Sequence, residues 1–174
     1  MQPRLTSERL VMRPRALGDV EACIQINSDP AVMRFLGPIW APELQRAHLT
    51  KQTLQDVGEG LGHWTILLKG RDEMLGWVML AMTGPDREPE LGYRLSRAAW
   101  GQGIATEAAS TILEYGLVER QLRDVFAIVH RDNTASHRVL HKLGFQPPEA
   151  QKRNAARSSA LLTQERWRLA ARLG

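Results

Sequence analysis

The sequence has a single cysteine, Cys23, among 174 residues. An intramolecular disulfide needs two cysteines and a thiolate zinc cluster needs more, so both are excluded. Cys23 lies next to Ile24 in a stretch with helical spacing, and no histidine is near it in the sequence. This context predicts a buried, unreactive thiol and not a nucleophile. Packing and hydrogen bonds must therefore hold the fold together.

Long apolar runs are also lacking. No stretch approaches the roughly 20 apolar residues that cross a bilayer, and the start, MQPRLTSERL, lacks the apolar core of a signal peptide. We therefore expect no membrane partner and a cytoplasmic location. Hydrophobic residues make up 43% and charged residues 24%, as in ordinary globular proteins. With no linker, repeat or low-complexity tract, the chain is expected to form one domain over residues 1–174.

The net charge of +4 is a modest basic excess. It suits an anionic ligand, a phosphate-bearing cofactor or an acidic partner. The basic residues are scattered, and the densest run, QKRNAAR at 151–157, contains no aromatic residue for base stacking. The charge pattern therefore does not favour a nucleic-acid-binding protein.

Apolar periodicity predicts a mixed α/β (α+β) arrangement. Expected strands cover 9–14, 63–68, 73–82, 89–96 and 124–130, with weaker ones near 146–152 and 158–162. Expected helices begin after a capping Asp19, at Pro30, at Pro42, at Ile104, at Asn133 and at Thr163. The continuous run at 124–130 is typical of a strand buried on both faces. Residues 89–130 should form two parallel strands joined by a helical, right-handed crossover.

The stretch WGQGIATEAA, residues 100–109, places two glycines at the start of a helical pattern. Bare backbone there suits an anion held by free N–H groups. A dinucleotide fingerprint would need glycine where Thr106 stands and an acidic residue where His130 ends the next strand. A Walker loop would need Gly-Lys-Ser/Thr, which is absent. A glycine-rich turn without a ligand remains the structural alternative.

The same stretch resembles the acetyl-CoA pyrophosphate loop of the GNAT N-acetyltransferase superfamily, Gln/Arg-x-x-Gly-x-Gly/Ala. Gly103 and Ala105 occupy its small-residue positions, and Trp100 stands where Gln or Arg is usual. Tryptophan followed by ATEA is similar to the RimJ/RimL-like branch, which acetylates N-terminal amines of ribosomal proteins. Further similar segments, in the same order, are TSERLVMRP, SDPAVMRFLG, ELGYRL, NTASHRVLHKLGF and LLTQERW. The resemblance covers nearly the whole chain.

The resemblance implies a GNAT fold, a splayed mixed sheet of about seven strands with helices on both faces. It implies acetyl transfer from acetyl-CoA, without a metal, to a primary amine by direct attack within a ternary complex. The acceptor is a protein N-terminus, possibly ribosomal, or a small molecule, and the protein is a monomer or a homodimer. A non-catalytic regulatory module that binds acetyl-CoA is the alternative.

The resemblance also assigns residues to the cofactor. The backbone of Arg94, Leu95 and Ser96 would hold pantetheine and acetyl, and an N–H near Leu95 would face the thioester carbonyl. Asn133 would contact the pantetheine amides, although it also suits a plain helix N-cap. The pyrophosphate would lie on the loop residues Trp100, Gly101, Gln102, Gly103, Ile104, Ala105 and Thr106.

Two residues are candidates for proton transfer. Glu90 is the expected base. Glu88 would take its place if the strand contains a bulge, solvent alone is a further possibility, and a surface or Arg94-paired carboxylate is the structural alternative. The tyrosine that many relatives use as the acid is replaced by Leu140. The branch has a serine instead, which here is Ser136.

The histidines give no expected metal site. His137 and His141 are spaced i, i+4, but no third ligand follows at a suitable spacing. We expect both to be exposed on a helix. His63 opens a central strand and is a candidate for lining the acceptor groove.

Overall fold

In the computed structural model, which describes residues 1–55, 60–148 and 163–170, seven strands form one sheet in the order of the sequence. Neighbouring strands pair antiparallel except β5 and β6, which pair parallel. The strands are β1 (Leu5–Thr6), β2 (Leu10–Pro14), β3 (Gly62–Leu68), β4 (Met74–Thr83), β5 (Glu88–Leu95), β6 (Asp124–His130) and β7 (Gln164–Ala170). The predicted mixed sheet of seven strands is confirmed.

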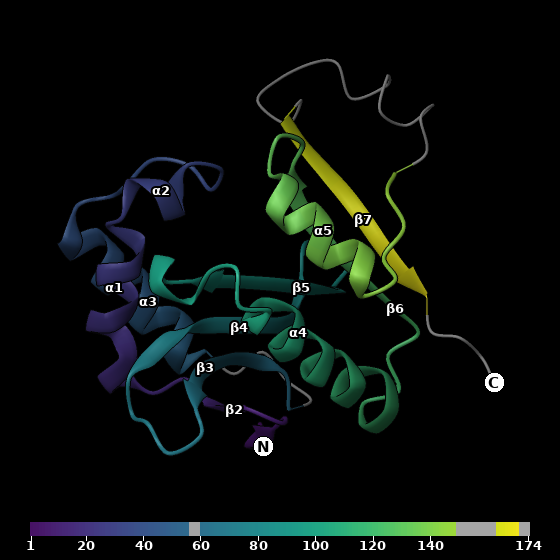
Figure 1. The fold of residues 1–174 in the computed structure, drawn as a ribbon, viewed down its shortest axis with the longest axis horizontal. Coiled ribbons are helices and arrows are strands. Elements are labelled where there is room, and N and C mark those ends of the chain that lie inside the picture. Colours follow the sequence, from purple (N-terminus) through teal and green to yellow (C-terminus); the bar gives the residue numbers. More distant parts are fainter. Residues whose placement is uncertain (56–59, 149–162, 171–174) are drawn as a thin grey trace.

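Helices cover both faces of the sheet, as expected (Figure 1). One face carries α4 and α5, and the other carries α1, α2 and α3. The helices are α1 (Val20–Asn27), α2 (Pro30–Met33), α3 (Pro42–Leu54), α4 (Ile104–Glu114) and α5 (Thr134–Lys142), and a π turn (Tyr115–Glu119) extends α4. None of the helices in the described part of the chain is long and apolar enough to cross a membrane.

The main core lies between the sheet and α4. Strand alternation brings Trp64 and Ile66 of β3 and Leu91 of β5 to this face, where all three are buried. The apolar stripe predicted for α4 packs on them, with Ala108 and Ile112 fully buried. The apolar faces that the sequence predicts for the strands and for α4 therefore pack against each other in one cluster.

A second apolar cluster packs α1 and α3 on the opposite face of the sheet. Trp77 of β4 contacts Cys23 and Ile24 of α1 there, and Leu49 of α3 completes the cluster. Burial raises the pKa of the Cys23 thiol to about 11. The thiol is thus buried and protonated at neutral pH, as predicted.

The end of the chain differs from the sequence prediction. The helix expected from Thr163 is wrong, because residues 164–170 form strand β7, paired antiparallel with β6. Trp167 faces the core and is buried, while Arg166 stacks over Phe126 on the other face. The alternation of Trp167 with Arg166 and Arg168 is the period of a strand and not of a helix. The weak strand expected at 158–162 lies outside the described residues.

Strand β6 is not buried on both faces. Ile128 is 46% exposed, because α1 and α3 cover other strands of this face. The prediction from the apolar run at 124–130 was therefore right about the strand and wrong about its surroundings. An apolar run shows that a strand is apolar on both faces, and only the placement of distant helices decides whether each face is covered.

Asp19 is the N-cap residue of α1, as predicted, but its side chain makes no capping hydrogen bond to the helix and instead joins the turn before α1 to the sheet. Its carboxylate accepts two hydrogen bonds from Arg13, at 2.6 and 2.7 Å, and one from the Thr65 hydroxyl at 2.9 Å. It also accepts from the Ala16 N–H at 2.8 Å. Burial alone would raise the pKa of Asp19, but these donors outweigh it and lower the pKa.

Because the pKa of Asp19 is lower in the folded state, its contribution is complete above the ordinary carboxyl pKa of about 3.9 and is lost as the pH falls through the folded value. We predict that Asp19→Asn lowers the free energy of unfolding at pH 7 by about 1.5–3 kcal/mol, as expected for hydrogen bonds to a charged group. Urea unfolding should show the gap to the native protein shrinking below about pH 4.

The exposed Asp86 supplies the control, since Asp86→Asn makes the same chemical change on a surface turn. It should leave the free energy of unfolding within about 0.5 kcal/mol of the native value. Equal stability of the Asp19→Asn variant and the native protein at pH 7 would show that the network does not stabilise the fold.

Candidate active site

The loop before α4 has the backbone that its glycines predict. Gly101 and Gly103 have φ angles of +73° and +77°, in the left-handed region that disfavours side chains. A Cβ added to Gly101 would meet no atom within 4 Å, and one on Gly103 only the Arg9 Nη2 at 3.6 Å. Packing therefore does not require these glycines. The turn requires them, and their open side leaves room for a ligand against the backbone.

The N-terminus of α4 is open to an anion. Gly103 is the N-cap residue and has no side chain that could accept a hydrogen bond from the first turn. The N–H groups of Ile104, Ala105 and Thr106 begin the helix without an intrahelical acceptor. Together with the helix dipole, they form a site that fits a phosphate. The residues predicted to hold pyrophosphate thus lie together at one helix end.

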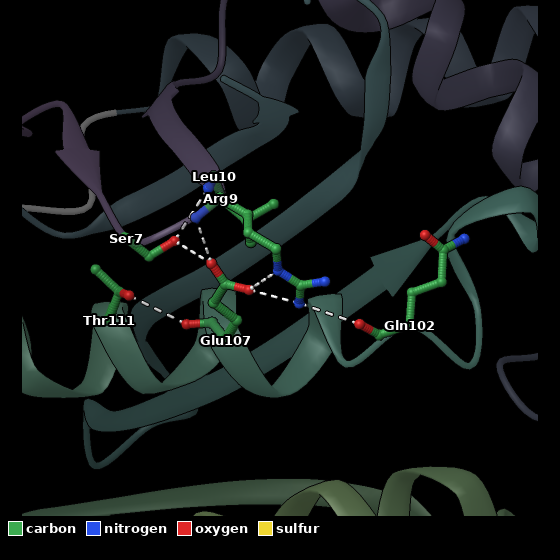
Figure 2. A network of polar contacts seen from close by, with 6 residues as sticks. All are labelled: Ser7, Arg9, Leu10, Gln102, Glu107 and Thr111. Atoms are coloured by element: carbon green, nitrogen blue, oxygen red, sulfur yellow. Dashed lines mark hydrogen bonds and ion pairs between the residues drawn. The ribbon is translucent and has the colours of Figure 1, made fainter. Parts of the chain in front are cut away.

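A polar network from the start of the chain holds this loop (Figure 2). Glu107, in the first turn of α4, forms an ion pair with Arg9 at 2.6 Å and accepts from the Ser7 hydroxyl at 2.7 Å and the Arg9 N–H at 2.9 Å. The Arg9 guanidinium also donates to the Gln102 carbonyl at 3.0 Å. Arg9 therefore joins the helix to the loop before it, a role that the sequence pattern did not indicate.

Strands β5 and β6 part at the loop end of the sheet. Their parallel pairing consists of Glu90 opposite Phe126, and no further pair of these strands follows in the described chain. The Ser96 N–H donates to the Leu75 carbonyl of β4 at 2.9 Å. Since bonding direction alternates along an antiparallel pair, the N–H groups of Tyr93 and Leu95 point away from β4, into the gap.

This geometry leaves only some of the backbone groups predicted to bind the cosubstrate available to it. The N–H groups of Arg94 and Ser96 face β4, so of the three residues assigned to pantetheine and acetyl only Leu95 directs its N–H into the gap. The Leu95 carbonyl accepts from the Trp100 indole at 3.1 Å. Trp100 thus fixes the end of β5. Its own N–H is bonded to Arg97 and is not available to the loop's ligand.

The two candidate bases differ in their partners. Glu90 lies at the closed end of the gap and accepts from the Thr83 hydroxyl at 2.7 Å. Glu88 is hydrogen-bonded to both Arg166 and Arg168, chiefly to Arg166, and these bonds lower its pKa. A carboxylate held ionised in this way is a weak base, so the structure favours Glu90 of the two.

The N-terminus of α5 faces the same gap. The Asn133 side chain caps the helix by accepting from the Ser136 N–H at 3.1 Å, as its alternative interpretation predicted. The Tyr93 hydroxyl donates to the Ser136 carbonyl at 3.4 Å and joins α5 to β5. Burial raises the pKa of Tyr93 to about 12. Leu140, at the position of the usual tyrosine, is buried in the core.

Of the two helix histidines, His141 is exposed as predicted and His137 is not. His137 and His141 of α5 both contact the Trp167 ring, with ring centroids 5.2 and 4.7 Å apart, and the His137 side chain is only 20% exposed. The expectation of an exposed pair is therefore wrong for His137, because β7 packs beside the helix. Burial lowers the pKa of His63 to about 3, so this imidazole is neutral. The described residues contain no cluster of three or more metal-ligating side chains.

An open helix N-terminus beside a gap in a mixed sheet defines an α/β protein that can hold a long, phosphate-bearing ligand against backbone groups. Residues 9–146 match the family model described as the acetyltransferase (GNAT) domain. The chain belongs to this family, and its activity is acetyl transfer from acetyl-CoA.

Known relatives carry the same activity in their names. The chain is 32% identical over 145 residues to an uncharacterized N-acetyltransferase, p20, of Bacillus licheniformis, covering 82% of each protein. It is 26% identical over 136 residues to the spermidine N(1)-acetyltransferase of Escherichia coli K12, covering 77% of this chain and 71% of that protein. RimL, a ribosomal L7/L12 α-N-protein acetyltransferase, shares the fold in its coenzyme A complex, with a TM-score of 0.77 and 18% identity over 97% of this chain and 98% of that one.

The glycine loop gives a direct test of cofactor binding. Coenzyme A should raise the melting temperature by mass action. At 100 times its Kd it should add about 2.7 kcal/mol to the free energy of unfolding. We predict that Gly103→Val abolishes this rise while the protein still folds, because the side chain would lie on the open side of the loop. Thermal melting with and without coenzyme A measures both effects.

Gly84 provides a matched control, since it has a φ angle of +68° and equally open surroundings on a turn away from the loop. Gly84→Val should cost similar backbone strain and keep the full response to coenzyme A. If coenzyme A does not change the melting of the native protein, the assignment of the loop is wrong.

Proposed function

We propose that the protein transfers the acetyl group of acetyl-CoA to a primary amine by direct attack within a ternary complex. The observation that carries the proposal is the open N-terminus of α4 next to the gap between β5 and β6. The first supplies N–H donors for the pyrophosphate, and the second supplies the Leu95 N–H for the thioester carbonyl. Acetyl-CoA brings an activated acyl group with a thiolate leaving group.

In this proposal Glu90 accepts a proton from the attacking ammonium. The amine nitrogen then forms a bond to the acetyl carbon, the carbon–sulfur bond breaks, and the second proton that the nitrogen loses is taken up by the sulfur. Glu90 stands where the strands begin to part, and Thr83 orients its carboxylate. Glu88 is engaged by two arginines and is not proposed for this role.

Two hydroxyl groups near the N-terminus of α5 can assist the leaving sulfur. Ser136 is half-buried one turn into the helix, at the branch position that the sequence predicts for the acid. Tyr93 reaches the same turn with its hydroxyl, and its high pKa keeps it protonated. We propose Ser136 for this hydrogen bond and treat Tyr93 as the group to test beside it.

Two kinds of amine acceptor are proposed, a protein N-terminus and a small-molecule amine. RimL is named for a protein N-terminus and the Escherichia coli relative for a polyamine. A screen that measures thiol release from acetyl-CoA with N-terminal peptides, amino acids and polyamines would distinguish them. If none of the screened amines causes thiol release while coenzyme A binds normally, amine acetylation is contradicted.

We predict that Glu90→Gln lowers turnover at neutral pH by about a hundredfold or more, because general base catalysis contributes about 10²–10⁴-fold. Coenzyme A affinity should stay near the native value. Activity should recover partly at high pH, where the amine loses its proton without help. Rates of thiol release across pH measure this, with Glu73→Gln, an exposed residue before β4, as the control. Unchanged turnover would remove Glu90 from the mechanism.

Ser136→Ala should slow turnover by about ten- to a hundredfold, since one hydrogen bond to a charged atom is worth about 1.5–3 kcal/mol. The KM of the acceptor should change little. The exposed Ser110 of α4 gives the control Ser110→Ala, which should keep native turnover. If Ser136→Ala keeps more than half of the activity and Tyr93→Phe loses it, the Tyr93 hydroxyl is the donor instead.

A further inference from the structure

A small pocket opens beside β5 on the face of the sheet opposite α4. It has a volume of about 150 Å³ and lies among α1, the segment from α2 to α3, and β5. Its polar lining residues are Asn27, Gln45, His48 and Arg94, and its apolar ones include Leu36 and Trp40. Such a volume accommodates a small molecule and is below that of a drug-sized ligand site.

Arg94 brings an unpaired cation into this pocket. Its guanidinium lies 5.0 Å above the Trp77 ring and donates to the Asn27 side chain. No carboxylate pairs with it among the described residues, and burial lowers its pKa to about 10, so it stays charged at neutral pH. A guanidinium has five N–H donors in a planar fork that fits a carboxylate. A bound carboxylate would supply the missing partner.

Gln45, which also lines the pocket, carries a buried amide oxygen without a partner. Only 5% of the residue is exposed, and its amide nitrogen donates to the Trp40 carbonyl at 2.8 Å. That bond sets the orientation of the amide, and its oxygen has no hydrogen-bond donor in the described structure. A buried acceptor without a partner is uncommon and costly. The complement of this oxygen is an N–H donor.

The pocket is next to the proposed site of transfer. Arg94 lies between Tyr93 and Leu95, whose N–H groups point into the gap between β5 and β6. One residue of β5 therefore joins the pocket to the backbone that is assigned to the thioester. The exposed side chains of Leu36 and Trp40 add apolar surface beside it.

We propose that this pocket selects an acceptor that carries a carboxylate beside its amine, a free α-amino acid with an apolar side chain. The carboxylate binds the Arg94 guanidinium and the apolar side chain lies against Leu36 and Trp40, which leaves the amine free for transfer. A polyamine would bring a second ammonium to an unpaired arginine and is disfavoured. The inference rests on the proposed function and names its substrate class.

The test compares amines that differ only in the carboxylate. L-leucine and 3-methylbutylamine form one such pair, and L-phenylalanine and 2-phenylethylamine form another. Thiol release from acetyl-CoA should show kcat/KM at least tenfold higher for the amino acid in the preferred pair, mainly through KM. Arg94→Gln should reduce this ratio to within about twofold. Arg71→Gln, which removes an equal charge on an exposed turn, should keep it.

The outcomes separate the two hypotheses. Faster transfer to the amines, to spermidine or to peptide N-termini than to the amino acids overturns the inference and leaves amine acetylation intact. No turnover with any acceptor contradicts the proposed function, and calorimetric titration of the coenzyme A-bound protein with L-leucine and L-phenylalanine then decides the inference. Binding that is lost in Arg94→Gln supports the pocket assignment, and absence of binding in the native protein refutes it.

Discussion

The structure depends on the separation of two parallel strands. β5 and β6 pair at Glu90 and Phe126 and then part, so the backbone of Tyr93 and Leu95 is left without a strand to bond. Unpaired backbone groups inside a sheet are costly unless a ligand or water satisfies them. Binding of an extended cosubstrate would complete the hydrogen bonding of the sheet.

The loop at the end of the gap is held by charges that are distant in sequence. Arg9 bonds both Glu107 and the Gln102 carbonyl (Figure 2). The Trp100 indole donates to the Leu95 carbonyl at the end of β5. These contacts fix the first turn of α4 without occupying its N–H groups. The site is therefore organised before ligand binding, which reduces the ordering cost that binding must overcome.

The two faces of β5 carry different parts of the proposed site. Tyr93 and Leu95 belong to the face that packs on α4 and α5, where the proposed hydrogen bond to sulfur would form. Arg94 belongs to the other face, where α1 and α3 enclose the small pocket. Strand alternation thus puts the two proposed binding sites on opposite sides of one strand, with the backbone of that strand between them.

The sequence by itself determined the order of most strands and helices, because apolar period and turn residues are local properties. It also determined the loop, since only glycine adopts the left-handed backbone of positions 101 and 103 without strain. It did not determine β7, which is a strand where the sequence predicts a helix, or the exposure of Ile128.

Only the tertiary structure decided which backbone groups face the gap, that Glu88 is held by two arginines, and that Arg94 has no carboxylate partner among the described residues. The physical reason is that these facts depend on contacts between segments far apart in the chain. Pairing with β4 sets the direction of the backbone groups, while side chains of β7 and α1 contact Glu88 and Arg94. No local pattern in β5 records which partners those segments bring.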